Sequence, residues 1–156
     1  MQITNACNYR CPMCSRISMT RRIKYMDFNL YKKLIGKLHS SNGPIYLHLL
    51  GEPLMHPDLD KFIAYGKSKG YEMGFFTNGS LLTEENSKKI IDAGLDYLVI
   101  SFEIIEDTFN ELRKGGSFDI VRKNIVVRKN IVRFLRLRNF KKQKKTVGYD
   151  FFYYSN

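Results

Sequence analysis

Short apolar segments alternate with longer amphipathic segments along the chain. The apolar segments have the length and residue types of strands, and they cover residues 2–4, 45–50, 71–76, 95–102 and 147–154. Apolar residues recur at helical spacing between them, in segments 28–38, 57–70, 83–94 and 106–113, and again from residue 118. This alternation predicts an α/β fold with a parallel sheet, either an open doubly wound sheet or a β/α barrel.

The ends of the predicted helices carry recognisable capping residues. Asp27 and Thr83 stand at N-cap positions, and Gly70 and Gly94 end the second and third helices. The run 97–100 is continuously apolar, which predicts a strand that is buried on both faces. Residues 15–27 are polar and basic and predict a loop.

The net charge of +11 is concentrated in one part of the sequence. Residues 120–149 hold eleven Lys or Arg and no Asp or Glu, whereas the other 126 residues hold 15 basic and 15 acidic residues. We expect a basic helix from about 118 to 138, in a basic region that extends to about 145. Such a stretch can bind nucleic acid, anionic lipid or an acidic peptide, but we interpret its charge as a solvated helix face. An inactive truncated remnant or a basic binding module remains an alternative function for the chain. Residues 121–126 are repeated as 127–132, and a tandem duplication is the simplest explanation.

Several classes of protein are excluded by the composition. The 156 residues correspond to one domain or part of one, with enough apolar residues for a core. No run of about 18 apolar residues exists, so we expect no membrane span. The N-terminus has no basic region followed by a long apolar stretch, so we expect no signal peptide. Unpaired cysteines without an export signal favour a reducing cytoplasm.

All three cysteines lie within eight residues, with the spacing C-x3-C-x2-C. The thiolates of Cys7, Cys11 and Cys14 could hold three corners of an iron–sulfur cluster and leave one iron open to a substrate or cofactor. A disulfide framework does not fit the odd number and tight spacing. Ordinary buried thiols remain an alternative, as does a zinc site whose fourth ligand is a histidine, namely His39, His48 or His56.

Polar residues follow each of the first four predicted strands, at the carboxyl ends where parallel sheets usually place an active site. The cysteines follow the first strand, and the carboxyl ends of parallel strands meet at one edge. The later strands end at further polar groups, namely Gly51-Glu52-Pro53, Thr77-Asn78-Gly79, and Ser101 with Glu103. We therefore expect all four groups to meet at one rim, which is the strongest argument for an active site.

These motifs, in this order, resemble the radical S-adenosylmethionine (radical SAM) enzymes over about residues 1–126. The resemblance implies a [4Fe–4S] cluster on the three cysteines, with S-adenosylmethionine (SAM) bound to the fourth iron through its amino and carboxylate groups. It places Met13 near the adenine and Gly51-Glu52-Pro53 at the methionyl amino group, although Leu50 replaces the first glycine of the family's Gly-Gly-Glu-Pro element. It assigns the ribose and methionine to Thr77, Asn78, Gly79, Ser101 and Glu103, and the SAM carboxylate to Arg113.

The resemblance also implies an architecture and partners. The family has a partial β/α barrel of six units, of which about five are predicted here, so we expect residues 1–156 to form one incomplete core domain. The arrangement is most similar to the peptide-modifying subset with a C-terminal SPASM-type extension, with the molybdenum-cofactor type as a near neighbour. No cysteine follows Cys14, so no auxiliary cluster or extension is expected. The implied partners are an electron donor such as flavodoxin or ferredoxin, an unidentified substrate for which a peptide is one class, and a chain that covers residues 147–154.

Overall fold

The described part of the chain is built on a three-stranded parallel sheet. The computed structural model describes residues 1–38 and 43–127. Its strands are β1 (Ile45–Tyr46), β2 (Met73–Thr77) and β3 (Tyr97–Ile100), in the spatial order β1-β2-β3. The register pairs Ile45 with Met73 and Thr77 with Ile100. The parallel arrangement with helical crossovers confirms the predicted α/β class.

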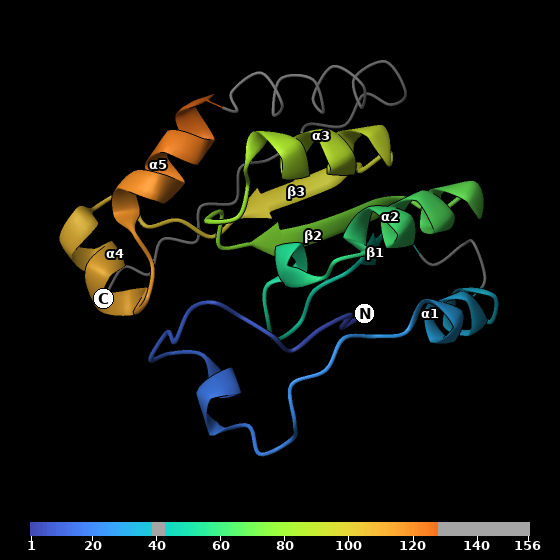
Figure 1. Cartoon of the computed structure of the whole chain (residues 1–156), viewed down its shortest axis with the longest axis horizontal. Helices are drawn as coiled ribbons and strands as arrows, with labels where there is room; N and C mark the ends of the chain where they lie inside the picture. The colour runs from blue at the N-terminus through green and yellow to red at the C-terminus, as the bar shows by residue number, and fades with distance from the viewer. Residues whose placement is uncertain (39–42, 128–156) are drawn as a thin grey trace.

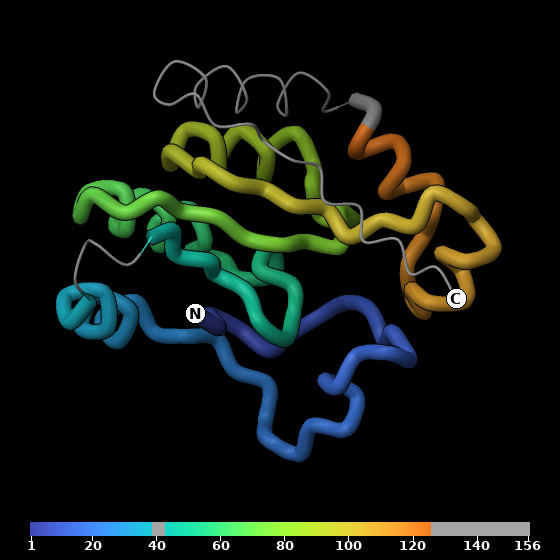
Figure 2. The backbone as a smooth tube through the Cα atoms, turned by 180° about the vertical axis from the view of Figure 1, so that it is seen from behind, coloured from blue at the N-terminus to red at the C-terminus, as the bar shows by residue number. Residues whose placement is uncertain are grey.

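Three helices cover one face of this sheet, as Figures 1 and 2 show from opposite sides. They are α1 (Phe28–Ile35), α2 (Leu59–Ser68) and α3 (Glu84–Asp92). Asp27 caps α1 by accepting hydrogen bonds from the amides of Asn29 and Leu30, and Thr83 caps α3 by accepting one from Asn86. The capping predictions are therefore confirmed.

The main hydrophobic core lies between the sheet and these helices. Its largest fully buried side chains include Tyr31 of α1, Phe62 of α2 and Phe75 of β2. The Tyr31 and Phe62 rings lie 4.4 Å apart between centroids, and the Tyr31 hydroxyl donates to the Phe62 carbonyl at 2.9 Å. These three helices therefore fix the sheet from one side.

Two further helices lie at the carboxyl ends of the strands. These are α4 (Glu106–Leu112) and α5 (Phe118–Val127), on the left in Figure 1, toward which the strand arrows point. A second buried cluster joins them to the cysteine segment through Tyr9, Cys11, Phe109 and Val121. The short 3-10 helices η1 (Ser15–Ser18) and η2 (Pro53–Met55) complete the described elements.

Two strand predictions are wrong. Residues 2–4 do not join the sheet as a parallel strand, because their backbone pairs antiparallel with residues 24–26: Thr4 and Tyr25 form a bridge, and the Met26 amide donates to the Ile3 carbonyl at 2.8 Å. Residues 97–100 are half-buried rather than fully buried. Within the described ranges β3 pairs only with β2, so it is an edge strand there.

Part of the prediction lies outside the described residues. The strand expected at 147–154 falls there, as does the basic region beyond residue 127. The second copy of the repeat, 127–132, also falls there except for its first residue. The first copy of the repeat lies in α5. The five expected β/α units are therefore represented by three parallel strands.

Candidate metal centre

The three cysteines lie in one loop between the sheet edge and α4 and α5. All three are free thiols, and Cys11 is buried while Cys7 and Cys14 are half-buried. The Cys14 amide donates to the Cys11 carbonyl at 3.0 Å, which turns the chain so that one short loop holds all three. Burial raises the pKa of Cys7 and Cys11, and the neighbouring Arg113 guanidinium opposes the rise at Cys11. A bound cation would favour the thiolate forms of these groups.

Aromatic packing anchors this loop to the later helices. Tyr9, between the first two cysteines, is 2% exposed and packs edge-on against Phe109 of α4, with ring centroids 6.5 Å apart. A Cβ on Gly116 would lie 2.7 Å from the Tyr9 ring, so only glycine allows this contact. The Arg10 amide also donates to the Lys114 carbonyl at 2.7 Å. The turn between α4 and α5 therefore packs directly on the cysteine loop.

Glu52 lies at the centre of the polar network on the sheet side. Glu52 is only 2% exposed. Its Oε1 accepts hydrogen bonds from Thr77 Oγ1 at 2.7 Å and from the Leu54 amide at 3.1 Å. Its Oε2 accepts from the Asn78 amide at 2.8 Å. Burial raises the pKa of Glu52, and the three hydrogen bonds oppose that rise. With respect to the described residues 1–38 and 43–127, one of the roughly four acceptor positions of this carboxylate stays open, on Oε2.

Gly51 allows the Glu52 loop to contact the segment that leads into Cys7. Its φ of +103° is a conformation that favours glycine. A Cβ there would lie 2.6 Å from the Thr4 carbonyl oxygen and 2.7 Å from that of Ala6. This close approach permits the Glu52 amide to donate to the Ala6 carbonyl at 2.7 Å. The glycine is therefore required by both backbone conformation and space.

Asn78 connects the end of β2 to the cysteine loop. Its Nδ2 donates to Asn8 Oδ1 at 3.0 Å and lies 4.0 Å from the Cys7 sulfur. Asn8 Nδ2 donates in turn to Ser80 Oγ at 2.8 Å. From the other side, Asn124 of α5 donates to the carbonyl of Gly79 at 2.8 Å. The turn after β2 is thus held between the cysteine loop and α5.

The residues predicted at the end of β3 form an ion pair with each other. Arg113 binds Glu103 through two hydrogen bonds, from Nε to Oε2 at 2.8 Å and from Nη2 to Oε1 at 2.6 Å. The Ser101 amide donates to the Thr77 carbonyl, which continues the pairing of β3 with β2. Met13 is 52% exposed on the surface of the cysteine loop. The residues predicted at the end of β3 therefore pair with β2 or with Arg113, while Met13 lies exposed on the cysteine loop.

The histidines considered as zinc ligands are engaged elsewhere. The ring of His56 uses both nitrogens, Nε2 with the Met26 carbonyl and Nδ1 as acceptor from the Asp58 amide. His48 Nδ1 accepts from the Phe76 amide, and His39 lies outside the described residues. Within residues 1–38 and 43–127, no group of three or more His, Cys, Asp or Glu side chains is arranged around a single metal ion. Cysteines that bind different irons of one cluster have no need to meet at one point.

Sequence reasoning missed several residues that position the site. Tyr9, Phe109 and Asn124 reach the cysteine loop or the β2 turn from distant parts of the chain. The buried position of Phe109 could be inferred from its helical spacing, but its partner could not. Asn8 and Ser80 are neighbours in sequence of predicted site residues. Their polar side chains were the only sequence signal of a role in the site.

The sequence of this chain matches a known protein family. The chain belongs to the Radical SAM superfamily, whose sequence profile matches residues 1–133. This family uses a [4Fe–4S] cluster and SAM, and the cysteine loop offers the thiolate donors that such a cluster requires.

Similar proteins are named for different activities. The tungsten-containing aldehyde ferredoxin oxidoreductase cofactor-modifying protein of Pyrococcus furiosus is 30% identical over 117 residues, which cover 74% of this chain and 33% of that protein. The PqqA peptide cyclase of Bradyrhizobium diazoefficiens is 30% identical over 131 residues, covering 83% and 34%. The chain thus spans about a third of the length of these relatives.

Solved structures confirm the family architecture. BtrN in complex with AdoMet and 2-DOIA matches with a TM-score of 0.57 and 30% identity, over 64% of this chain and 42% of that chain. Streptococcus suis SuiB bound to S-adenosylmethionine matches with a TM-score of 0.66 over 84% of this chain and 31% of that one. At 17% identity the second match shows the fold alone. None of the helices within the described residues is long and apolar enough to cross a membrane.

Proposed function

We propose that this chain forms the cluster- and SAM-binding core of a radical SAM enzyme. The observation that carries the proposal is the position of three free thiols at the carboxyl edge of the sheet, directly beside the Glu52–Asn78 network. When bound, the cluster would supply the electron that cleaves SAM to methionine and a 5′-deoxyadenosyl radical, which abstracts hydrogen from a substrate. In this proposal Cys7, Cys11 and Cys14 hold three irons.

The residues around the cysteines would bind and orient SAM. The open acceptor position on Glu52 Oε2 suits the methionyl ammonium, and a cation there would offset the burial of the carboxylate. Thr77 and Asn78 would act by holding that carboxylate in place. Gly79, Ser101 and the Glu103–Arg113 pair would face the ribose and methionine, and the exposed Met13 would cover the adenine.

The reductant, compartment and substrate are also part of the proposal. A reductant such as flavodoxin or ferredoxin would supply the electron, and free thiols suit a reducing cytoplasm. The relatives include proteins named as peptide cyclases, which supports a peptide as one substrate class.

Anaerobic reconstitution tests the proposal. The chain is loaded with iron and sulfide, reduced with dithionite, and examined by electron paramagnetic resonance with and without SAM, while the same sample is assayed for 5′-deoxyadenosine. We expect a cluster signal that changes when SAM is added, together with 5′-deoxyadenosine. The matched variant Cys14→Ala should lose the full cluster and the cleavage of SAM. A chain that stays folded and binds zinc but no cluster would contradict the proposal.

A further inference from the structure

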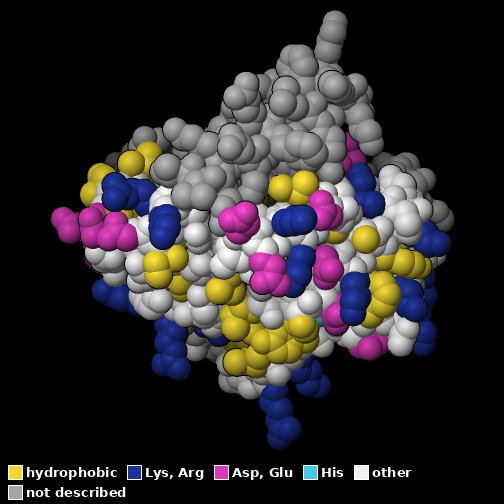
Figure 3. Space-filling model, turned by 45° about the horizontal axis from the view of Figure 1, so that its top comes forward, with side chains coloured by type: hydrophobic (Ala, Val, Ile, Leu, Met, Phe, Trp, Pro, Cys, Tyr) yellow, Lys and Arg dark blue, Asp and Glu magenta, His cyan; other side chains and the backbone are white. Residues whose placement is uncertain are grey.

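The first 26 residues are positively charged, although the residues outside 120–149 are neutral when counted together. They contain five Lys or Arg and no Asp or Glu. We call these five residues the N-terminal basic surface; they are Arg10, Arg16, Arg21, Arg22 and Lys24. Four of them are exposed and Arg16 is half-buried. In Figure 3 the side chains that project furthest from the lower edge are Lys or Arg, whereas the face toward the viewer carries both signs.

These cations have no acidic partners among the residues that the structure describes. The ion pairs there join other residues, such as Lys67 with Asp96 and Arg113 with Glu103. Arg16 donates to the Tyr9 carbonyl, and Arg21 donates to Gln2 Oε1 at 2.6 Å. The guanidinium groups of Arg16 and Arg21 are thus bonded to neutral acceptors, and no carboxylate among the described residues forms an ion pair with this surface.

The N-terminal basic surface is fixed directly to the base of the cysteine loop. Asn5, two residues before Cys7, accepts a hydrogen bond from the Lys24 amide at 2.7 Å and donates one to the Arg22 carbonyl at 3.0 Å. Thr4 Oγ1 donates to the Lys24 carbonyl at 2.9 Å. Arg10 and Arg16 flank Cys11 and Cys14 in the loop itself. Any partner bound to this surface therefore lies next to the proposed cluster.

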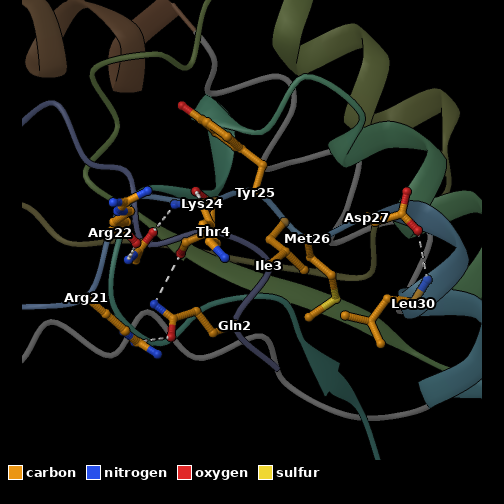
Figure 4. Close-up of a pocket in the computed structure, with 11 residues that line it drawn as sticks. Gln2, Ile3, Thr4, Arg21, Arg22, Lys24, Tyr25, Met26, Asp27 and Leu30 are labelled. Carbon is orange, nitrogen blue, oxygen red and sulfur yellow. Dashed lines mark hydrogen bonds between the residues drawn. The ribbon is translucent and has the colours of Figure 1, made fainter.

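The same surface offers apolar contacts. Ile17, Ile23 and Tyr25 are 55%, 60% and 47% exposed. Next to Tyr25 lies a cavity of about 710 Å³, lined by residues 2–5, 21–22, 24–27 and Leu30. Figure 4 shows Tyr25 at its upper side and Arg21 and Arg22 at the opposite side from Leu30. Exposed apolar side chains rimmed by arginine are typical of a protein-binding surface rather than of a site for a small anion.

We infer that the N-terminal basic surface docks the acidic flavoprotein that delivers the electron to the cluster. The inference rests on the proposed function and adds the place where the reductant binds. In Figures 1 and 2 the segment 15–25 forms the lower edge of the molecule, away from β3, so a partner there leaves the sheet side of the loop to SAM. With the cluster held by Cys7, Cys11 and Cys14, a donor docked here would supply it with one electron from its flavin hydroquinone, and no bond would form or break in that transfer.

Charge reversal tests this inference by separating protein-mediated from chemical reduction. In the reconstituted chain, Arg21→Glu, Arg22→Glu and Lys24→Glu are combined, and cluster reduction by flavodoxin hydroquinone is followed by stopped-flow absorbance at several salt concentrations. We expect the second-order rate to fall about tenfold or more at low salt and to lose its salt dependence, because electrostatic steering raises association rates by factors of this size. Dithionite, which needs no docking, should reduce the variant as fast as the parent.

A matched control changes the same charge elsewhere. The control combines Lys33→Glu, Lys37→Glu and Lys88→Glu, at exposed positions on α1, just after α1 and on α3. Together these substitutions should leave the rate of reduction by flavodoxin close to that of the parent. The milder set Arg21→Gln, Arg22→Gln and Lys24→Gln should give an intermediate rate if the reversal acts through charge rather than misfolding.

The outcomes separate the inference from the function on which it rests. Equal flavodoxin rates and equal salt dependence in the parent and the reversed variant would overturn the docking surface while leaving the radical SAM core intact. Equal slowing by the control set would overturn it too, because net charge alone would then explain the effect. If the parent takes up no cluster, the proposed function fails, and the inference fails with it. Salt-dependent binding of a single-stranded RNA to this surface, without any binding of flavodoxin, would also overturn it.

Discussion

Substitution of Gly51 tests whether close backbone contact builds the site. In Gly51→Ala the new Cβ would lie 2.6 Å and 2.7 Å from two carbonyl oxygens, of Thr4 and Ala6. Neither oxygen belongs to a flexible side chain, so the two loops must separate. The strained φ of +103° adds about 1–3 kcal/mol, and the overlap adds about 1–3 kcal/mol. The sum, about 2–6 kcal/mol, is a large part of the roughly 5–15 kcal/mol that stabilises a typical domain.

Gly70 provides the matched control. Its φ is +85°, but a Cβ there would meet no heavy atom within 4 Å. Gly70→Ala therefore bears only the conformational cost, and the difference between the two variants isolates the overlap, about 1–3 kcal/mol. With a urea m-value of about 2 kcal/mol/M, an overlap of about 2 kcal/mol separates the two denaturation midpoints by about 1 M.

Cluster loading gives a second measurement for the same pair. Separation of the loops breaks the hydrogen bond from the Glu52 amide to the Ala6 carbonyl, one residue before Cys7. Iron per chain after anaerobic reconstitution should therefore fall well below the parent value in Gly51→Ala and stay at that value in Gly70→Ala. Coincident urea midpoints for the two variants would refute the reasoning from close contact.

Three further substitutions test polar groups that are buried or half-buried. Because burial raises the pKa of Glu52 above the ordinary 4.5, the folded parent binds this proton more tightly than the unfolded chain does. Its free energy of unfolding should therefore fall relative to that of Glu52→Gln as the pH rises above about 4.5, which urea denaturation at several pH values measures. Asp96→Ala leaves the Lys67 ammonium and the buried Met73 amide without their acceptor, so we expect a loss of about 2–3 kcal/mol in urea denaturation. Arg113→Lys keeps the charge but loses the two-point contact, so thermal or urea denaturation should show a loss of about 1 kcal/mol.

Controls for these predictions come from exposed positions. Asp58→Ala removes the exposed pair with Lys61, and Arg122→Lys alters the exposed pair with Asp119; neither should change the urea midpoint measurably. A loss in Asp58→Ala as large as that in Asp96→Ala would argue against burial as the cause. For Glu52, a constant difference between parent and variant across the pH range would contradict the raised pKa.

Local signals in the sequence were sufficient for the described helices and the order of the motifs. The caps at Asp27 and Thr83 depend on residues within one helical turn, and the structure confirms both. The α/β class followed from strand and helix periodicity. The convergence of Glu52 and Asn78 followed from the general geometry of parallel sheets, which places the carboxyl ends of the strands at one edge. The cysteine loop meets them although residues 2–4 are not a strand of that sheet, so its position depends on other contacts.

The predictions that failed depended on long-range partners. Residues 2–4 have the residue types of a strand, but residues 24–26 compete for their backbone hydrogen bonds and take them out of the sheet. The apolar run 97–100 looked doubly buried, yet in the described part of the chain it is an edge strand. The residue composition of a strand indicates a preference for extended backbone. It does not identify the strand with which that segment pairs.

The sequence by itself determined the donor atoms of this protein. They are three thiols in one loop, one carboxylate after β1 and a polar turn after β2. Only the tertiary structure decided how they are held. It placed Phe109 against Tyr9, brought Asn78 to Glu52 and Cys7, paired Arg113 with Glu103, and fixed the Arg22–Lys24 backbone to Asn5. These contacts join residues far apart in the chain, and their geometry arises only when the sheet, the helices and the loops pack together.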